Sequence, residues 1–560
     1  MQRTRIVWPV AVAAALLAAL GVIGASAAPV QTPGNVVTQS NLIAANTLVA
    51  LPGPAGGAPP ASAISMGMVQ GAVYDAVNAI TGPKYREPYL LERRFAPTSS
   101  KRAAAVTAAY KVLSNIVSTV PERIAFPAKA TVLQTLESQY AASLATIPGS
   151  PSKARGVAAG NAAANAMITA RQGDGRFGPS QWVPNSAPGH WQPLVNPATG
   201  QPILDPTPWA GGVKPFLMES SSQFRTSPSF ALDSAAYATE LNEVKTTGSA
   251  TSAARRADQT YIARWWQTPP LKTWSDVARD LIGRNGFDIV DSARLLAMQN
   301  LSAADTSINC WNDKYHYDQW RPWQAIPRAA EDGNPATTAE AGWTALITPP
   351  YPDHPSGANC LNAAHVAVLR MFFGDVIDDG FDITSVSTAL QPGNPTTRHF
   401  DTFSQPLAEL IEARIWAGLH FRRGMCKRSY LRSRSRTTWL RTTSNRWAVA
   451  ADRRACPSSN PEKTRIERAF SRSQSGVHQV DPAPSGSAAQ LPLSTTSVSL
   501  RNVACDSVVG GRNDDAHARR SLPPAGSRNA RERCRCRARH DEAADVVTTS
   551  KDFRGSSYSR

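Results

Sequence analysis

The sequence predicts an all-α protein, a large helical bundle followed by a C-terminal tail of different composition. Apolar residues recur at spacings of three and four along most of residues 64–309, the pattern of helices that bury one face. Alternating strand patterns are scarce over the same range. The chain has 560 residues, 42% of them hydrophobic, which is enough for a large core. A packed helical bundle is therefore expected.

The predicted helices follow one another in chain order. The first begins at Ile64 and carries an apolar stripe that includes Met68, Val73 and Ile80. Most of the following helical stretches are rich in alanine, which favours close packing; they are expected at 101–118, 128–146, 153–171, 234–247, 251–266, 273–284 and 287–309. Residues 173–230 are rich in Gly, Pro, Trp and Ser instead, so a long irregular excursion is expected there.

The N-terminus is typical of a cleaved secretory signal over residues 1–28. Arg3 and Arg5 precede an apolar run that ends in Ala25-Ser26-Ala27-Ala28. The alternative is an uncleaved membrane anchor, because the run approaches spanning length. With cleavage, the mature protein is exported to the periplasm or the medium and has no stable membrane span. Residues 29–62 are rich in Pro, Gly, Ala and Thr and are expected to form an extended lead-in.

Charge and cysteine divide the chain into a body and a tail. Residues 1–420 carry 31 Lys+Arg and 30 Asp+Glu, whereas residues 421–560 carry 28 and 12. The net charge of +17 therefore lies almost wholly in the tail, together with five of the seven cysteines. The tail has few aromatic residues, so nucleic acid is not an expected partner. In the body, Cys310 and Cys360 could pair in an oxidising compartment.

The first candidate functional segment reads Lys314-Tyr-His-Tyr-Asp-Gln-Trp-Arg321-Pro322. Lys314 and Arg321 are seven residues apart, so on one helix they would share a face that ends near Pro322. A solvated basic face is the alternative, but the neighbouring Trp311 and Trp320 indicate a partly buried setting. Two desolvated cations require an anion.

The second segment reads Tyr351-Pro-Asp-His354-Pro355-Ser356-Gly357-Ala358 and leads into an apolar stretch with helical spacing. Ser356 is a natural N-cap. The free N–H groups and the dipole of a helix N-terminus suit an oxyanion, although an ordinary cap would have the same sequence.

The third segment reads Glu412-Ala-Arg414-Ile-Trp-Ala-Gly418-Leu-His420-Phe421. Arg414 and His420 are six residues apart and do not share a face of one continuous helix. Gly418 could end the helix and let His420 turn back toward Arg414. Taken alone, His420 could equally be an ordinary core or surface residue.

Together, Lys-x6-Arg-Pro, Pro-Ser-Gly and Arg-x5-His resemble the signature of vanadium-dependent haloperoxidases. That family shares a helical superfamily with type-2 phosphatidic acid phosphatases and bacterial acid phosphatases. The stretch from Met68 to Ile80 and the sequence Trp311-Asn-Asp-Lys-Tyr are similar to the bacterial branch. The resemblance covers about residues 35–422, which divide into an N-terminal helical part at 63–300 and a catalytic part with the oxyanion site at 301–422.

The resemblance implies a vanadate cofactor, with phosphate as a competing oxyanion. Lys314, Arg321 and Arg414 would clamp its oxygens, Ser356 and Gly357 would donate to them, and His420 would bind the metal. One cage of positive donors can hold both vanadate and a phosphoryl transition state, because the two share shape and charge. The implied partners are hydrogen peroxide and a halide or small organic acceptor. The sequence indicates no oligomeric state.

Two departures from the family pattern bear on activity. The family usually reads Pro-Ser-Gly-His, whereas this chain has Ala358 at the position of the acid–base histidine. Loss of such a group typically costs roughly two to four orders of magnitude in rate. His354, His365 and His316 are nearby candidates to replace it. In addition, no Asp lies within reach just after His420, and helical periodicity stops there.

The altered tail suggests a frame change between about His420 and Gly424. One permitted codon choice for residues 436–447, read from its third base, encodes an amphipathic helix end followed by proline. Residues 423–560 would then be a basic, disordered tail outside the family sequence. Resequencing the DNA across codons 414–447 tests this hypothesis, and an unaltered frame would refute it.

Two alternative functions remain at this point. One is an acid phosphatase with His420 as nucleophile, a reading that Ala358 weakens because the leaving alkoxide needs a proton. The other is a relative that binds vanadate or phosphate without turnover.

Overall fold

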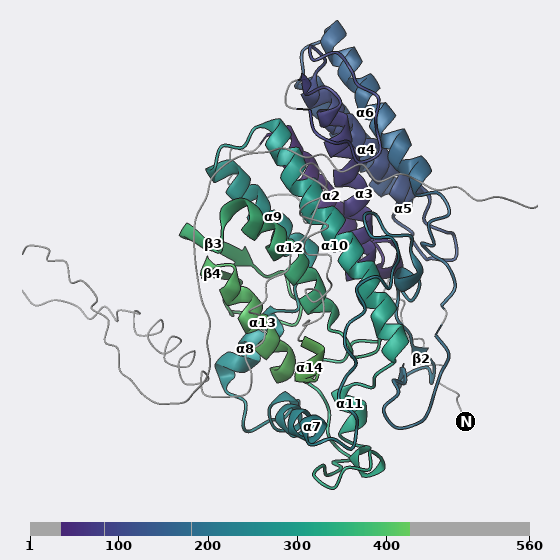
Figure 1. Ribbon diagram of the computed structural model, residues 1–560, viewed down its shortest axis with the longest axis vertical. Helices are drawn as coiled ribbons and strands as arrows, with labels where there is room; N and C mark the ends of the chain where they lie inside the picture. The colour runs from purple at the N-terminus through teal and green to yellow at the C-terminus, as the bar shows by residue number, and fades with distance from the viewer. Residues whose placement is uncertain (1–34, 83–84, 181, 426–560) are drawn as a thin grey trace, which may run out of the picture. The chain divides into compact units, whose positions relative to one another are not determined.

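The computed structural model describes residues 35–425, except 83–84 and 181, and shows the helical bundle that the sequence predicts (Figure 1). The first half contains α2 (Val36–Ala50), η1 (Gly53–Ala55), α3 (Pro59–Asn78), α4 (Lys101–Ser118), α5 (Lys129–Ala145), α6 (Pro151–Ala170), β1 (Leu194–Val195), β2 (Pro202–Ile203), η3 (Ala210–Gly212), α7 (Ala235–Gly248), α8 (Ala257–Trp265) and α9 (Pro270–Arg284). The second half contains α10 (Ile289–Tyr317), α11 (Pro322–Ala325), η4 (Ala329–Glu331), α12 (Gly357–Phe373), β3 (Val376–Thr384), β4 (Thr397–Thr402), α13 (Ser404–Trp416) and α14 (Arg422–Met425).

Most of the predicted helices are present near their expected bounds, although α8 begins at Ala257 rather than 251 and α10 continues beyond 309 to Tyr317. Several of their first turns carry side-chain caps. Ser100, Ser150 and Ser234 each accept a hydrogen bond from a backbone N–H in the first turn of α4, α6 and α7. Asp288 caps α10 in the same way and accepts from two N–H groups. These caps satisfy donors that a helix leaves unpaired at its N-terminus.

The expected extended lead-in at 29–62 is wrong over its described part. Residues 36–50 form helix α2, and α3 already begins at Pro59. Asn35 caps α2 by accepting from the N–H of Val37 and also donates to Ser292 on α10. The buried residues Val37, Ala44 and Leu48 give α2 an apolar face. The high content of small residues in this segment concealed that pattern.

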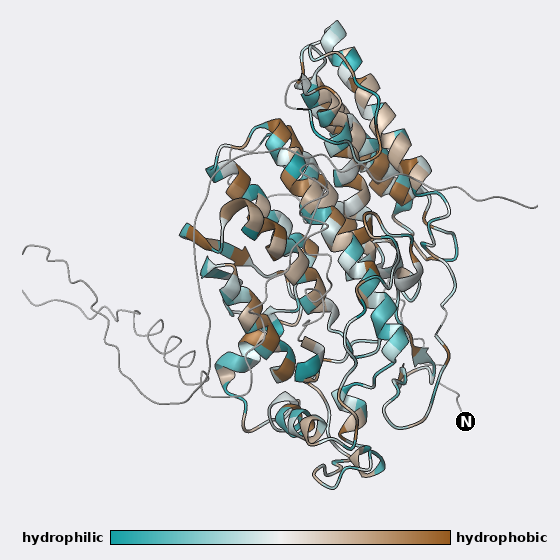
Figure 2. Ribbon diagram, in the orientation of Figure 1, coloured by the Kyte–Doolittle hydropathy of each residue, from teal (hydrophilic) through white to brown (hydrophobic). Residues whose placement is uncertain are grey.

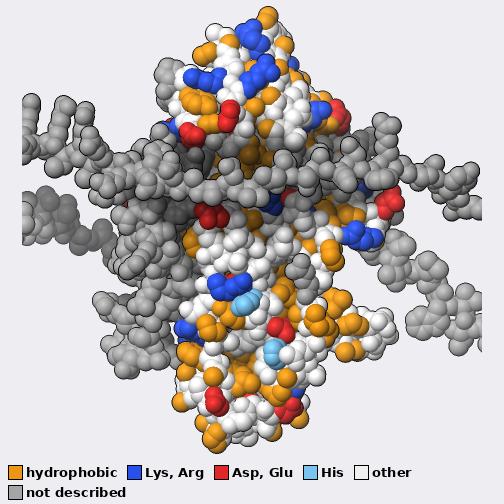
Figure 3. All heavy atoms as spheres, turned by 45° about the vertical axis from the view of Figure 1, so that its right-hand side comes forward, with side chains coloured by type: hydrophobic (Ala, Val, Ile, Leu, Met, Phe, Trp, Pro, Cys, Tyr) orange, Lys and Arg blue, Asp and Glu red, His pale blue; other side chains and the backbone are white. Residues whose placement is uncertain are grey.

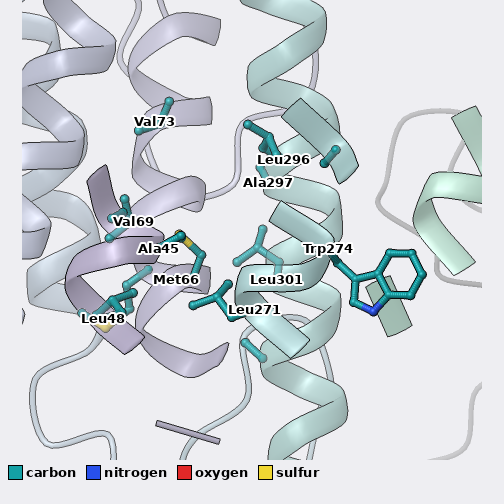
Figure 4. Close-up of a cluster of buried hydrophobic side chains, with 14 of the residues drawn as sticks. Ala45, Leu48, Met66, Val69, Val73, Leu271, Trp274, Leu296, Ala297 and Leu301 are labelled. Carbon is teal, nitrogen blue, oxygen red and sulfur yellow. The ribbon is translucent and has the colours of Figure 1, made fainter. Parts of the chain in front are cut away.

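The core lies where α2, α3, α9 and α10 meet. Figure 4 shows side chains from these four helices converging, among them Leu48, Val69, Leu271 and Leu301. Helix α3 packs along α10 at close range, since a Cβ at Gly67 would lie 2.9 Å from the Cβ of Ala304. A larger residue at position 67 would therefore push the two longest core helices apart.

Two buried aspartates attach irregular segments to this core. Asp75 on α3 accepts hydrogen bonds from the backbone N–H groups of residues 89, 90 and 91. Asp305 on α10 accepts from those of residues 216, 217 and 218, which belong to the predicted excursion at 173–230. Each carboxylate thus satisfies three backbone donors of a segment that has no regular ladder of its own.

Helix α10 changes character along its length, continues past its predicted end at 309 and stops before Pro322. Figure 2 shows that it becomes more hydrophilic toward its C-terminal end. It stops at Tyr317, because Asp318 adopts a left-handed conformation with φ 46°. Lys314 and Arg321 therefore do not share a face of one helix, and that prediction is wrong. Pro322 does not end the segment but begins the short helix α11.

The hairpin of β3 and β4 is an element that the sequence analysis missed. Its antiparallel register pairs Phe381 with Phe400 and is irregular between Val376 and Phe381. Asp379 and Gly380 have φ values of 59° and 57° at that irregularity. The resulting bulge breaks the alternation of exposed and buried residues that would have indicated a strand.

Several predictions fall at or beyond the limits of the described chain. The signal peptide at 1–28 and nearly all of the basic tail at 423–560 lie outside the described residues, and the predicted boundary at 422/423 falls within α14. The boundary at 300/301 falls within α10, so the two predicted helical parts share one helix.

Two further observations concern the helices and the surface. Among the described residues, no helix has both the length and the apolar character that spanning a membrane requires. On the face in Figure 3, basic and acidic side chains are interspersed.

Candidate functional site

The three sequence segments singled out above meet at one end of the bundle. They are the end of α10 with the start of α11, the loop at 351–356 that leads into α12, and the turn between α13 and α14. A disulfide between Cys310 and Cys360 joins α10 to α12 directly beneath this junction. The pairing that the sequence left open is thus present in the structure.

Lys314 holds the loop before α12. Its side chain is fully buried, and Nζ donates to the carbonyls of Pro352, Asp353 and Pro355 at 2.9, 3.1 and 2.7 Å. The three hydrogens of the ammonium group are thereby engaged by backbone oxygens. These bonds fix the loop but leave the positive charge in place.

Arg321 is fully buried and also binds backbone carbonyls. Its Nε donates to the carbonyl of Tyr351 at 2.8 Å, and Nη1 donates to that of Leu419 at 2.7 Å. Nη1 also lies 3.4 Å from Nε2 of His420. Arg321 thereby joins the 351–353 loop to the turn after α13. Burial lowers the pKa of Arg321, and the nearby Asp353 opposes that shift.

Arg414 lies on α13 and completes a group of three cations. Its Nη1 donates to the carbonyl of Trp266 at 3.2 Å, whereas its Nε is buried and has no hydrogen-bond partner among the described residues. Burial lowers the pKa of Arg414 to about 10, so the guanidinium remains charged at neutral pH. The partly buried ring of Tyr351 lies 5.1 Å from Arg321 and 5.2 Å from Lys314, so one ring links these two cations.

His420 reaches this group because the chain turns sharply after α13. Gly418 has φ +70°, as expected for a residue that ends a helix, and a side chain there would strike the carbonyl of Gly248. His420 is buried, and its Nδ1 lies 2.5 Å from Oδ1 of Asp353. Burial and the neighbouring cations keep the pKa of His420 well below its ordinary value. The ring is therefore neutral, with Nδ1 toward Asp353 and Nε2 toward Arg321.

The start of α12 completes the site. The hydroxyl of Ser356 accepts from the N–H of Asn359 at 3.3 Å and retains its own hydrogen as a donor. Gly357 is the first helical residue, whose N–H has no intrahelical acceptor. A Cβ at Gly357 would lie 2.8 Å from the Trp311 ring, so only glycine lets the helix start so close to it. The N–H of Ser356 donates to the carbonyl of Gly424 at 2.9 Å, which brings α14 over the site.

Most hydrogen-bond donors of the three cations have acceptors, but their positive charge exceeds the negative charge of the site. Lys314, Arg321 and Arg414 bring three positive charges, whereas Asp353 is the carboxylate that pairs with the group. Burial raises the pKa of Asp353 to about 7, although Arg321 and Lys314 oppose that shift. Backbone carbonyls satisfy the donors of the cations but carry no net charge. An anion would therefore be held here more favourably than in water-exposed surroundings.

Ala358 lies on the first turn of α12, and none of the three histidines considered as substitutes shares that turn, although His354 lies in the 351–356 loop close enough to His420 to oppose its protonation. His354 is buried with its ring against Tyr317, and its Nε2 lies 2.8 Å from the carbonyl of Ser227. His316 is exposed on α10. His365 is buried on α12, and burial lowers its pKa to about 3.

Two residues of the site had no role in the sequence analysis. Asp353 supplies the carboxylate beside His420. It lies 67 positions before His420 in the chain, whereas the family pattern led us to expect an Asp just after it. Tyr351 supplies the ring that Lys314 and Arg321 contact. Both belong to the motif at 351–358, so their position in that motif was the available signal.

A family model and a curated relative both show similarity to vanadium haloperoxidases. The model for the VCPO second helical-bundle domain matches residues 294–430, a range that contains all six predicted site residues. The vanadium chloroperoxidase of Curvularia inaequalis is 24% identical over 173 residues, which cover 24% of this chain and 28% of that protein. The chain thus aligns with little more than a quarter of that relative's length.

Solved structures extend the likeness over most of the described chain. A bacterial vanadium-dependent iodoperoxidase has a TM-score of 0.52 at 22% identity and covers 70% of this chain and 92% of its own. A bacterial vanadium-dependent chloroperoxidase in its holo form has a TM-score of 0.53 at 18% identity, with coverages of 70% and 93%. The chain is thus similar to vanadium haloperoxidases over residues 294–430 and shares its helical fold with these two bacterial enzymes.

Proposed function

We propose that this protein is an exported, vanadate-binding haloperoxidase that uses hydrogen peroxide to oxidise halide. The observation that carries the proposal is a group of three cations, the fully buried Lys314 and Arg321 with the partly buried Arg414, which pairs with one carboxylate and adjoins Nε2 of a neutral His420. The disulfide of Cys310 and Cys360 supports export, because such bonds persist in oxidising compartments.

The donor set fits a tetrahedral oxyanion. The buried Nε of Arg414 lacks a protein partner among the described residues, and the Ser356 hydroxyl and the Gly357 N–H lie at the start of α12. These groups would donate to the oxygens of vanadate, while Nε2 of His420 would bind the metal. Bound vanadate would supply the Lewis acidity that activates peroxide for the two-electron oxidation of halide.

The two remaining cations have distinct tasks in this proposal. Arg321 lies next to Nε2 of His420 and would add a further donor to the oxyanion. Lys314 is bonded to three carbonyls, so it would act chiefly by holding the 352–355 loop and by its charge. Asp353 would keep the proton of His420 on Nδ1 and so preserve the metal-binding lone pair.

The overall reaction balances as halide, hydrogen peroxide and one proton giving hypohalous acid and water. Delivery of that proton is the task that a histidine at position 358 would perform. Ala358 cannot do so, and we therefore expect a low rate of turnover.

The test compares halide oxidation with and without orthovanadate, alongside hydrolysis of an aryl phosphate. Bromide oxidation that requires vanadate is the expected result. Hydrolysis of the aryl phosphate without vanadate would instead support a phosphatase with His420 as nucleophile. Vanadate binding with neither activity would identify a non-catalytic anion-binding relative.

Vanadate binding is measured directly by isothermal titration of the full chain. Arg414→Ala is expected to abolish it, because this removes a buried donor and a charge. Arg284→Ala, which removes a partly exposed guanidinium paired with Asp280, should leave the affinity unchanged. Unchanged binding in folded Arg414→Ala protein would refute the proposed site.

A further inference from the structure

A cavity of about 430 Å³ lies beside the cation group, between the start of α3 and the loop at 205–207. Trp311 and Tyr351 form part of its wall. The same two rings contact Lys314, whose Nζ lies 5.7 Å from the Trp311 ring and 5.2 Å from the Tyr351 ring. The cavity and the cations are therefore neighbours through a single layer of aromatic side chains.

The remaining wall of this cavity is mainly apolar. It includes Val49, Leu51, Ala58, Pro60, Pro206 and Pro350. Its volume lies in the usual range of small-molecule sites, roughly 300–1,000 Å³. Aromatic and aliphatic walls of this kind favour a molecule that buries a ring.

The polar groups of the cavity disfavour an anionic ligand. Asp205 is the acidic residue of the wall, and its oxygens already accept from the N–H and hydroxyl of Thr207, from Nε1 of Trp311 and from the hydroxyl of Tyr315. Because these donors already bond to Asp205, they are not free to bind an anionic ligand. A carboxylate or phosphate entering the cavity would meet like charge and would lose its hydration.

We propose that this cavity binds a neutral aromatic molecule, with its ring against Trp311 and Tyr351, and that this molecule is the organic acceptor of the halogenation. Binding follows from the cavity alone, whereas the role as acceptor rests on the proposed function. Hypohalous acid would replace an aromatic hydrogen by halogen and release water. An acceptor held one ring away from the cations would meet the oxidant before it diffuses into solution.

The experiment measures binding of 2-naphthol to the full chain by isothermal titration, without vanadate or peroxide. We expect saturable binding of 2-naphthol, and at least about tenfold weaker binding of 2-naphthoate, which has the same ring system and a negative charge. Equal affinities for the two compounds would overturn the proposal, because the cavity would then not select for neutrality.

Val49→Trp fills the cavity from the end of α2 and is expected to weaken 2-naphthol binding at least about tenfold. The matched control is Val386→Trp, at an exposed position outside the cavity lining, which should leave the affinity unchanged. An unchanged affinity in folded Val49→Trp protein would overturn the proposal.

A second measurement needs no variant. Photolabelling of the unaltered chain with a neutral naphthyl azide is expected to modify peptides that contain residues 49–60 or 205–207, and modification confined to other peptides would contradict the cavity. Failure of halide oxidation would leave both results standing, so the two proposals fail separately. Halide oxidation without any 2-naphthol binding would instead mean that halogenation takes place in solution.

Discussion

The middle and the C-terminal end of α10 handle buried charge in opposite ways. Toward the core, Asp305 accepts three backbone N–H groups, as Asp75 does on α3. At the C-terminal end, Lys314 donates to three backbone carbonyls. Both arrangements satisfy hydrogen bonds with uncharged backbone, so neither removes the net charge.

The difference lies in how each group can respond to that leftover charge. Burial raises the pKa of Asp75 to about 6, so this acid can lower its electrostatic cost by taking up a proton near that pH. Arg414, whose pKa burial lowers to about 10, keeps its charge at neutral pH. A buried aspartate can therefore act as a self-contained clamp, whereas a group of buried cations continues to attract an anion.

The largest expected effect tests whether the cation group lacks only a proton donor. Ala358→His should raise vanadate-dependent bromide oxidation by about 10²- to 10⁴-fold, because it restores an acid–base at the start of α12. Initial rates at saturating vanadate measure this. Ala358→Asn adds a polar side chain that does not titrate and should not raise the rate. Equal gains with His and Asn would contradict the acid–base role.

The second prediction concerns the cross-link beneath the site. The disulfide closes a loop of 50 residues. Replacing Cys310 and Cys360 by serine should lower the free energy of unfolding by about 4 kcal/mol, because the unfolded chain gains conformational entropy. Urea unfolding measures the loss. Reductant should destabilise the unaltered protein and leave the double variant unchanged; equal sensitivity of the two would argue against this bond.

The third prediction addresses the carboxylate of Asp305, which accepts hydrogen bonds from three backbone N–H groups. Asp305→Ala should lower the free energy of unfolding by about 3 kcal/mol, because three buried N–H groups lose their acceptor. Asp280→Ala removes a partly exposed ion pair with Arg284 and should cost less than about 1 kcal/mol. Urea unfolding compares the two variants. A similar cost for both would show that the clamp contributes little.

The smallest effect concerns a buried group without a charge partner. Burial lowers the pKa of His365 to about 3. Between pH 6.5 and 3 the unfolded chain binds a proton at this residue that the folded chain does not. The free energy of unfolding should therefore fall on acidification, by about 1.4 kcal/mol for each pH unit. Unfolding of wild type and His365→Leu at pH 6.5 and 4.5 checks this, since the variant should lose that part of the pH dependence.

Local signals in the sequence were sufficient for most helices. Apolar spacing predicted α4 at its observed bounds, and the structure shows that Ser100 caps it. The N-cap role of Ser356 and the turn at Gly418 are confirmed. These features depend on residues within one helical turn, which is why a single sequence reveals them.

Features that depend on distant contacts were not predicted. Helix α10 ends at Tyr317 because Asp318 takes a left-handed conformation, and its carbonyl accepts from the N–H of Trp191 in a remote segment. The pairing of Asp353 with His420 joins residues that are close only after three helices have packed. Helix α2 required knowledge of its partners, since its small residues are buried only by neighbouring helices.

The bond from the N–H of Ser356 to the carbonyl of Gly424 has a consequence for biosynthesis. Every cation of the site is translated before residue 424, yet the start of α12 gains this acceptor only when that residue has left the ribosome. A nascent chain stalled or truncated just after His420 would contain all six candidate site residues and still lack the closing contact. Assembly of the site is thus tied to the last step in synthesis of the bundle.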